Sequence, residues 1–133
     1  MATIERFEDI EAWQKARELT KSIYRCTSDG AWSKDFGLRD QIRRAAVSIM
    51  SNIAEGFERG GATEFARYLT MAKASSGEVR CQLYVALDIG YIDQPVFDQL
   101  SALAVKTSGM IAGFANYLKG RTRRSGKDGS TTF

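Results

Sequence analysis

Residues 41–56 read QIRRAAVSIMSNIAEG and carry the pattern that decides the fold. Ile42, Ala45, Ile49 and Ile53 recur at helical spacing and define an apolar stripe. Alanine and serine occupy much of the remaining circumference, so neighbouring backbones can approach this helix on more than one side. The segment therefore predicts the central helix of a helical assembly, with two adjacent arginines, 43 and 44, built into it.

Four helices are predicted, over residues 9–27, 38–58, 64–89 and 94–119. The third has the clearest periodicity, a 4-3-4-3 spacing of Phe65, Leu69, Ala72, Ser76, Val79, Leu83, Ala86 and Gly90. Such a heptad seam predicts near-parallel packing against another helix. Four long helices with short connections predict an all-α, antiparallel, up-down-up-down four-helix bundle.

Particular residues are expected to set the helix ends. Thr63 is predicted to cap the third helix and Gly90 to end it, while Asp93 is predicted to cap the fourth. Trp32 and Phe36 are expected to pin the first connection to the bundle. Gly56 lies inside a helical pattern, where it indicates close packing, a bend or an earlier helix end. The bundle is assigned to residues 1–119 and a disordered basic tail to residues 120–133.

Composition argues against several kinds of active site. The chain of 133 residues contains no histidine, which removes histidine general bases and the common zinc and haem sites. The two cysteines, Cys26 and Cys81, are expected to be reduced core thiols. No secretory signal and no apolar run of about 20 residues is present, so a cytoplasmic protein without a membrane span is expected. We therefore predict a protein that is not an enzyme and has no cofactor or metal.

The positive charge lies at one end of the sequence. Residues 120–133 contain four basic groups and one acidic group, a net of +3 that equals the net charge of the whole chain. The bundle is therefore neutral, and any basic surface on it must come from segregation of its charges.

At this point the motifs resemble a known family. They are residues 7–16, 37–38, 41–57 and 64–65, then Leu69, Ala72, Ser75 and Glu78, and finally residues 87–92. In order and spacing, over about residues 7–119, they resemble the bacterial four-helix bundle proteins called the 23S rRNA-intervening-sequence (S23) family. Met50 stands where many members have proline, and Ala74 where many have glycine.

The resemblance implies a bundle that assembles into a ring, expected to be a homopentamer. Some members of the family are encoded inside insertions of 23S rRNA genes. A related branch, the accessory variability determinants of diversity-generating retroelements, binds nucleic acid and a reverse transcriptase. RNA, DNA and a protein such as a reverse transcriptase are therefore the expected partners besides a second copy of the chain.

Arg39, Arg43 and Arg44 are the leading candidates for nucleic-acid binding. Arg39 and Arg43 stand four residues apart, and a ring would repeat the cluster as a basic band for phosphates. The alternative is that they pair with carboxylates of the same or a neighbouring subunit, and both readings stay open. Further candidates are the exposed cations of the loops and the tail: Lys34, Arg59, Arg121, Arg123, Arg124 and Lys127. The tail serves equally as a nucleic-acid arm or as a solubilising segment.

Two further groups are read as structural. A polar row, comprising Gln41, Ser48, Asn52, Glu55, Ser75 and Glu78, is expected to hydrogen-bond within itself across helices or subunits. The aromatic residues Trp13, Trp32, Tyr68, Tyr84, Tyr91 and Tyr117 could stack on bases, but most are expected in the core or an interface.

Overall fold

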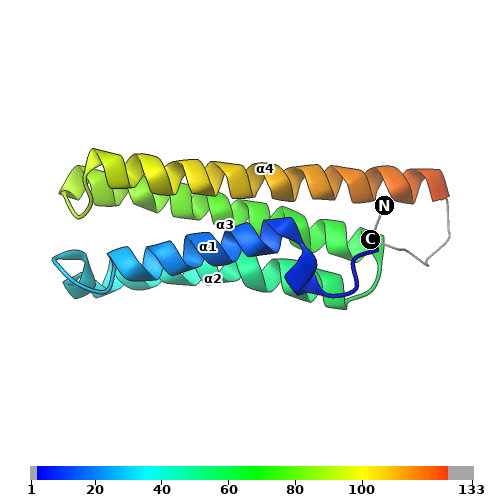
Figure 1. Ribbon diagram of the computed structural model, residues 1–133, viewed down its shortest axis with the longest axis horizontal. Helices are drawn as coiled ribbons and strands as arrows, with labels where there is room; N and C mark the ends of the chain where they lie inside the picture. Colours follow the sequence, from blue (N-terminus) through cyan, green and yellow to red (C-terminus); the bar gives the residue numbers. More distant parts are fainter. Residues whose placement is uncertain (1–2, 126–133) are drawn as a thin grey trace.

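Four long helices run up and down the molecule in chain order, joined by short connections (Figure 1). The computed structural model describes residues 3–125, with side chains through Arg121. The α-helices are α1 (Glu11–Cys26), α2 (Phe36–Glu58), α3 (Ala62–Ile89) and α4 (Gln94–Ser125). Two short 3-10 helices, η1 (Phe7–Asp9) and η2 (Trp32–Lys34), precede α1 and α2. The predicted all-α up-and-down bundle is confirmed.

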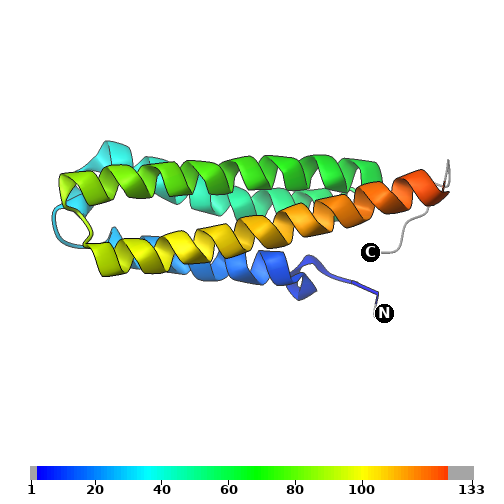
Figure 2. The same cartoon turned by 90° about the horizontal axis from the view of Figure 1, so that it is seen from above.

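Each helix packs on its neighbour in the chain, and α4 also packs on α1, which closes the bundle (Figure 2). The predicted stripes form its core, because Ile42, Ile49 and Ile53 of α2 are completely buried. The predicted seam of α3 is equally inaccessible from Phe65 to Ala86, and it contacts α2 on one side and α4 on the other. Only Gly90, the last member, is exposed, since it lies beyond the helix.

The predicted ends of α3 and α4 are mostly confirmed. Gly90 takes a left-handed conformation (φ 91°) that favours glycine and ends α3. Asp93 caps α4, since its Oδ1 accepts a hydrogen bond from the Val96 backbone at 3.0 Å. The prediction for Thr63 is wrong: Gly61 is the N-cap, and its carbonyl accepts a bond from the Phe65 amide at 2.9 Å. Helix α3 therefore begins at Ala62, without a side-chain cap.

Close packing explains Gly56, which lies buried inside α2. A Cβ atom at this position would lie 2.6 Å from the Tyr68 Cβ and 3.0 Å from the Phe65 Cδ1. Both neighbours belong to α3, so glycine lets these two helices approach each other here. Of the three expectations for Gly56, close packing is confirmed, and α2 continues past it to Glu58.

Replacing Gly56 with alanine tests that contact. Alanine gains about 1 kcal/mol of helix propensity, but the new methyl must displace Tyr68, and overpacking costs about 1–3 kcal/mol. We expect Gly56→Ala to lower the free energy of unfolding by up to about 2 kcal/mol in denaturant titrations. The exposed Gly77 of α3, where a Cβ would meet nothing within 4 Å, is the control: Gly77→Ala should stabilise the protein. A stabilised Gly56→Ala protein would contradict the close approach.

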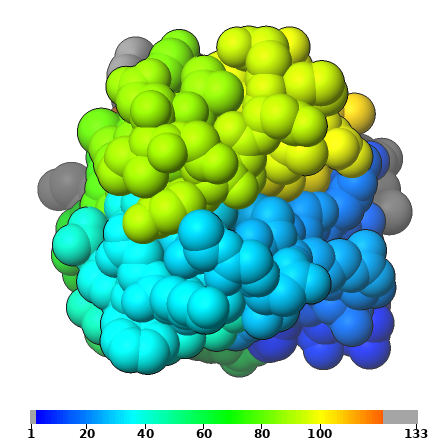
Figure 3. All heavy atoms as spheres, turned by 90° about the vertical axis from the view of Figure 1, so that its left-hand side faces the viewer, coloured from blue at the N-terminus to red at the C-terminus, as the bar shows by residue number. Residues whose placement is uncertain are grey.

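At the end of the bundle seen in Figure 3, the α1–α2 connection lies against the α3–α4 turn. Trp32 is 1% exposed and stacks on Tyr91, with ring centroids 6.0 Å apart. The Tyr91 hydroxyl donates to Asp35 Oδ2 at 2.9 Å, and this hydrogen bond raises the pKa of Tyr91. Trp32 therefore pins the connection as predicted. The prediction for Phe36 is wrong, because its side chain is 63% exposed.

The fourth helix is longer than predicted and ends at Ser125 instead of Lys119. Arg121 supports the added turn, since its Nη1 donates to the Tyr117 hydroxyl at 3.1 Å one turn earlier. The first part of the predicted tail is therefore helical. Residues 126–133, the rest of that tail, lie outside the described residues.

The two cysteines differ in their surroundings. Cys26 is half-buried, and burial raises the pKa of its thiol to about 11, which keeps it protonated and unreactive. Cys81 lies on the exposed side of α3, so its assignment to the core is wrong. Within residues 3–125, no helix combines the length and apolar character required to cross a bilayer.

Candidate nucleic-acid interface

Arg43 stacks on an aromatic ring at the edge between α1 and α2. Its guanidinium carbon lies 4.4 Å from the ring centroid of Tyr24, which is 41% exposed. The Arg43 Nε donates to Thr27 Oγ1 at 2.8 Å, and Nη2 donates to Ser28 Oγ at 3.4 Å. These neutral hydroxyls fix the guanidinium and leave its charge uncompensated, a suitable arrangement for an anion.

Arg39 repeats the arrangement one turn earlier in α2. Its guanidinium carbon lies 4.7 Å from the ring centroid of the exposed Phe36. The Arg39 Nη1 donates to the Ser33 carbonyl at 3.0 Å, and Nε pairs with Asp40 at 2.9 Å. That ion pair is the internal pairing that the alternative reading expected, so Arg39 is the more neutralised of the two.

Arg44 borders the same hollow as Arg43 and Tyr24. It lines a hollow of about 580 Å³ between α1 and α2, with Tyr24, Asp40, Arg43, Val47, Ser48 and Ser51. It also lines a hollow of about 460 Å³ between α2 and α3, with Gln41, Ala45, Ser48, Ser75, Glu78 and Gln82. Arg44 is exposed and forms no ion pair with another described residue. Within the predicted cluster, Arg39 and Arg43 therefore form the stacked pair, and Arg44 lies beside Arg43 on the same hollow.

The polar row forms hydrogen bonds across α2 and α3. Asn52 and Ser75 both donate to the Ser48 hydroxyl, each at 3.1 Å. The other contacts bring in residues that the prediction did not include: Gln82 donates to Gln41 at 3.4 Å, and Tyr68 donates to Glu55 at 3.2 Å. Hydrogen bonding within the row is therefore found for Ser48, Asn52 and Ser75, whereas Gln41 and Glu55 bond residues outside it. The sixth, Glu78, lines the second hollow and forms no ion pair among residues 3–121.

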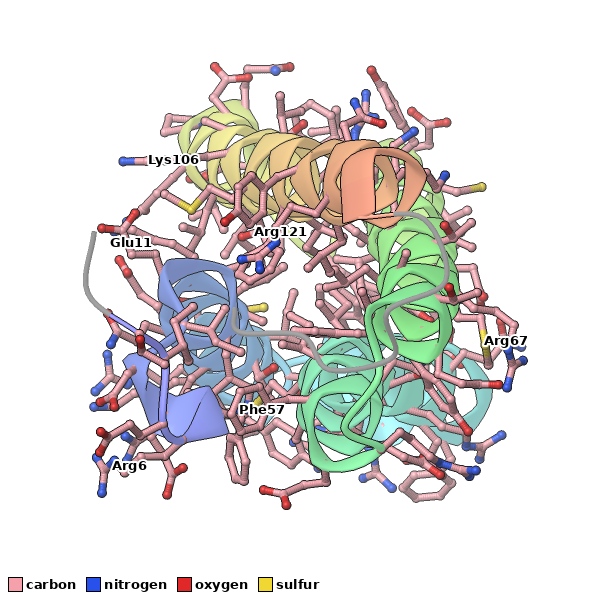
Figure 4. All side chains as sticks on the ribbon, turned by 90° about the vertical axis from the view of Figure 1, so that its right-hand side faces the viewer. Arg6, Glu11, Phe57, Arg67, Lys106 and Arg121 are labelled. Atoms are coloured by element: carbon pink, nitrogen blue, oxygen red, sulfur yellow. The ribbon has the colours of Figure 1, made fainter. Side chains whose placement is uncertain are left out.

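The remaining candidate cations differ in their contacts. Arg59 pairs with Glu55 at 3.0 Å and lies over the Tyr68 ring, and its hydrogen bond with Glu55 raises its pKa. Figure 4 shows Arg121 pointing from α4 toward the other helices, and its Nη1 donates to the hydroxyl of Tyr117 in the same helix. Lys34 is exposed in η2. The side chains of Arg123 and Arg124, and all of Lys127, lie outside the described residues.

Most of the predicted aromatic residues pack inside the protein. Trp32 and Tyr68 are buried, whereas Tyr84 is 56% exposed and packs on Phe97 at a centroid distance of 4.8 Å. The stacking partners of the arginines, Tyr24 and Phe36, were not among the predicted site residues. Phe36 and Arg39 are three residues apart in one helix, a spacing that could have indicated their contact.

The described part of the chain shows no group of three or more cysteine, aspartate or glutamate side chains arranged for a metal ion. The geometry instead offers fixed guanidinium groups beside exposed rings. Guanidinium groups supply positive charge that suits phosphates, and exposed rings supply faces on which bases stack.

Comparison with known proteins places this bundle in a family. The pattern of the 23S rRNA-intervening sequence proteins matches residues 8–113, which covers most of the helical core. The chain belongs to this family. Among solved structures, it is similar to a protein of unknown function from the S23 ribosomal protein family of Bacteroides thetaiotaomicron. The two are 20% identical and superpose with a TM-score of 0.72 over 78% of this chain and 97% of that one. No curated protein matches the chain.

Proposed function

We propose that this S23 family protein is a non-enzymatic, oligomeric nucleic-acid-binding protein. Arg39 and Arg43 make its main phosphate contacts, and Arg59 and the basic C-terminal segment, residues 120–133, supplement them. The observation that carries the proposal is the pair of guanidinium–aromatic stacks, with Phe36 and Tyr24, side by side on one edge of the bundle. Aromatic rings give sequence-tolerant base stacking, and phosphate contacts position a strand without reading its sequence.

Assembly is part of the proposal because one subunit is a weak binder. The bundle without its C-terminal segment is electrically neutral, so a single copy offers only a few local cations. A ring of about five subunits, as the family resemblance implies, would repeat the stacked pair around its circumference. Weak phosphate contacts along one strand then act together and raise the overall affinity.

Fluorescence anisotropy with single- and double-stranded RNA and DNA at low salt tests the binding. We expect affinity to fall steeply as salt rises, because each neutralised phosphate releases counterions, and we expect little sequence preference. Replacing Arg39 and Arg43 together with glutamine should weaken binding about tenfold or more and flatten the salt dependence. Truncation after Lys119 should weaken binding further by removing the basic C-terminal segment.

Arg17→Gln is the matched control for the double variant. Arg17 is exposed on α1 and also lies over an aromatic ring, that of Trp13 at 5.7 Å, but it stands outside the proposed edge. Its replacement should leave affinity unchanged, and circular dichroism should show unchanged helicity for all variants. If the intact protein binds none of the four nucleic acids, the proposal is wrong.

A protein-binding scaffold ring is the second candidate. The observation that favours it is that Arg39 and Arg43 already have hydrogen-bond partners inside the chain. In that case they hold the α1–α2 connection, and the ring would bind a protein partner such as a reverse transcriptase. Loss of stability in the Arg39/Arg43 double variant, without nucleic-acid binding by the parent, would favour this function.

A further inference from the structure

The exposed side of α3 carries an unusual row of residues. Met71, Ala74, Glu78, Cys81 and Val85 follow one another at 3-4-3-4 spacing, and all five are exposed. Met71 is 42% and Val85 40% exposed, and Glu78 is the one charged member of this α3 row. Arg67, four residues before Met71 on the same side, points away from the bundle in Figure 4. The row therefore faces outward, with a second heptad pattern opposite the buried seam.

A matching row lies on the exposed side of α2. Arg44, Val47, Ser51, Ala54 and Glu58 also follow 3-4-3-4 spacing, and Val47 is 40% exposed. Small and apolar residues form the middle of this α2 row, with Arg44 and Glu58 near its ends. Two helices pack closely when such rows meet, because small side chains let their axes approach. The uncharged middle of the α2 row is therefore a candidate contact surface.

Hydrogen bonds within the chain show which residues of the two rows stand at the same height along the bundle. Gln41 bonds Gln82, Ser48 bonds Ser75, and Glu55 bonds Tyr68. The two helices are therefore antiparallel, so a later residue of α2 stands level with an earlier residue of α3. Positions 44, 47 and 51 of α2 stand level with positions 79, 76 and 72 of α3. Glu78 is then within one residue, about 1.5 Å, of the height of Arg44.

We infer that the α3 row of one copy packs against the α2 row of the next, with Arg44 of one copy paired with Glu78 of its neighbour. The inference rests on the ring proposed above and assigns its subunit contact. In a ring whose axis is parallel to the helices, all copies have equal height, so level residues meet. Ser51 is then within one residue of the height of Met71, and Val47 lies midway between Ala74 and Glu78. Neither Arg44 nor Glu78 has an ion-pair partner among the described residues of its own chain.

Charge reversal at the two positions tests the contact. We expect Arg44→Glu and Glu78→Arg each to place like charges opposite one another and to reduce the mass in sedimentation or light scattering toward the monomer, 14.8 kDa. The double variant Arg44→Glu/Glu78→Arg restores opposite charges and should regain the mass of the parent. Arg80→Glu, an exposed reversal on α3 outside the row, should keep the mass of the parent.

Cys81 provides a second readout, because it lies within the α3 row. We expect a thiol reagent to modify Cys81 slowly in the parent oligomer and faster in either single variant. Cys26, with its pKa raised to about 11, should stay unreactive in every folded variant and so reports unfolding. Ala74→Trp should dissociate the oligomer in the same way without unfolding it, since position 74 is exposed.

The outcomes separate this contact from the proposed function. If both single reversals keep the mass of the parent oligomer and its slow modification of Cys81, the proposed contact is wrong. The proposal of nucleic-acid binding is then unaffected. A folded double variant that stays dissociated also overturns the Arg44–Glu78 pairing. Reversals that change the melting temperature but not the mass would place the ion pair inside one chain. A monomeric parent overturns the contact and the ring together.

Discussion

Ile49→Asp, and equally Ile53→Asp, should unfold the protein. Both side chains are completely buried on the core side of α2. An aspartate there must either stay ionised without a partner or take up a proton, and it leaves part of the isoleucine volume empty. Each of these terms costs several kcal/mol, which is comparable with the total stability of about 5–15 kcal/mol for a domain of this kind.

Circular dichroism melting measures this effect, with Gln41→Asp as the control. Gln41 is an exposed residue of the same helix, so aspartate there gives up at most the 3.4 Å hydrogen bond with Gln82. We expect the free energy of unfolding of the control to lie within about 1 kcal/mol of that of the parent. The core variants should lose their helical signal at room temperature. A core variant that melts like the parent would mean that α2 presents a different side to the core.

The core could be predicted because its pattern is local. The seam from Phe65 to Ala86 and the stripe from Ile42 to Ile53 follow from helical periodicity alone, and both are buried. Gly90 and Asp93 were predictable for a similar reason, since a helix end depends on a few consecutive residues. Thr63 was mistaken because the extended backbone of Gly61 starts α3 one residue before it, without a side-chain cap.

The site could be predicted only in part because its partners come from distant positions. Arg43 of α2 is held by Thr27 and Ser28, which follow α1, and no spacing in the sequence pairs them. Adjacent residues also differ: Arg43 and Arg44 both border the hollow between α1 and α2, but only Arg44 also borders the hollow that Glu78 lines. The outward row of α3 could not be matched with the row of α2 from the sequence. The hydrogen bonds between α2 and α3 were needed to show which residues stand at the same height.

Two aromatic residues near the α1–α2 connection, one buried and one exposed, allow a test of whether burial decides the contribution of an aromatic side chain to stability. Trp32 and Phe36 were both expected to pin this loop, but Trp32 is 1% exposed and Phe36 is 63% exposed. Trp32→Ala removes a buried indole and its stack on Tyr91, so we expect a loss of about 3–5 kcal/mol in the free energy of unfolding. Phe36→Ala removes only the contact with Arg39, and we expect a loss within about 1 kcal/mol.

Chemical denaturation of both variants separates the two roles. Tyr91 stacks on Trp32 and also donates a hydrogen bond to Asp35. We therefore expect this hydrogen bond to be weakened in Trp32→Ala but not in Phe36→Ala. The near-ultraviolet circular dichroism of Tyr91 would then change only in the tryptophan variant, after subtraction of the Trp32 signal itself. Amide hydrogen exchange should also accelerate around residues 32–35 and 90–93 in that variant, since the two turns are held together there. Equal destabilisation by the two substitutions would show that Phe36, despite its exposure, holds the connection as firmly as Trp32.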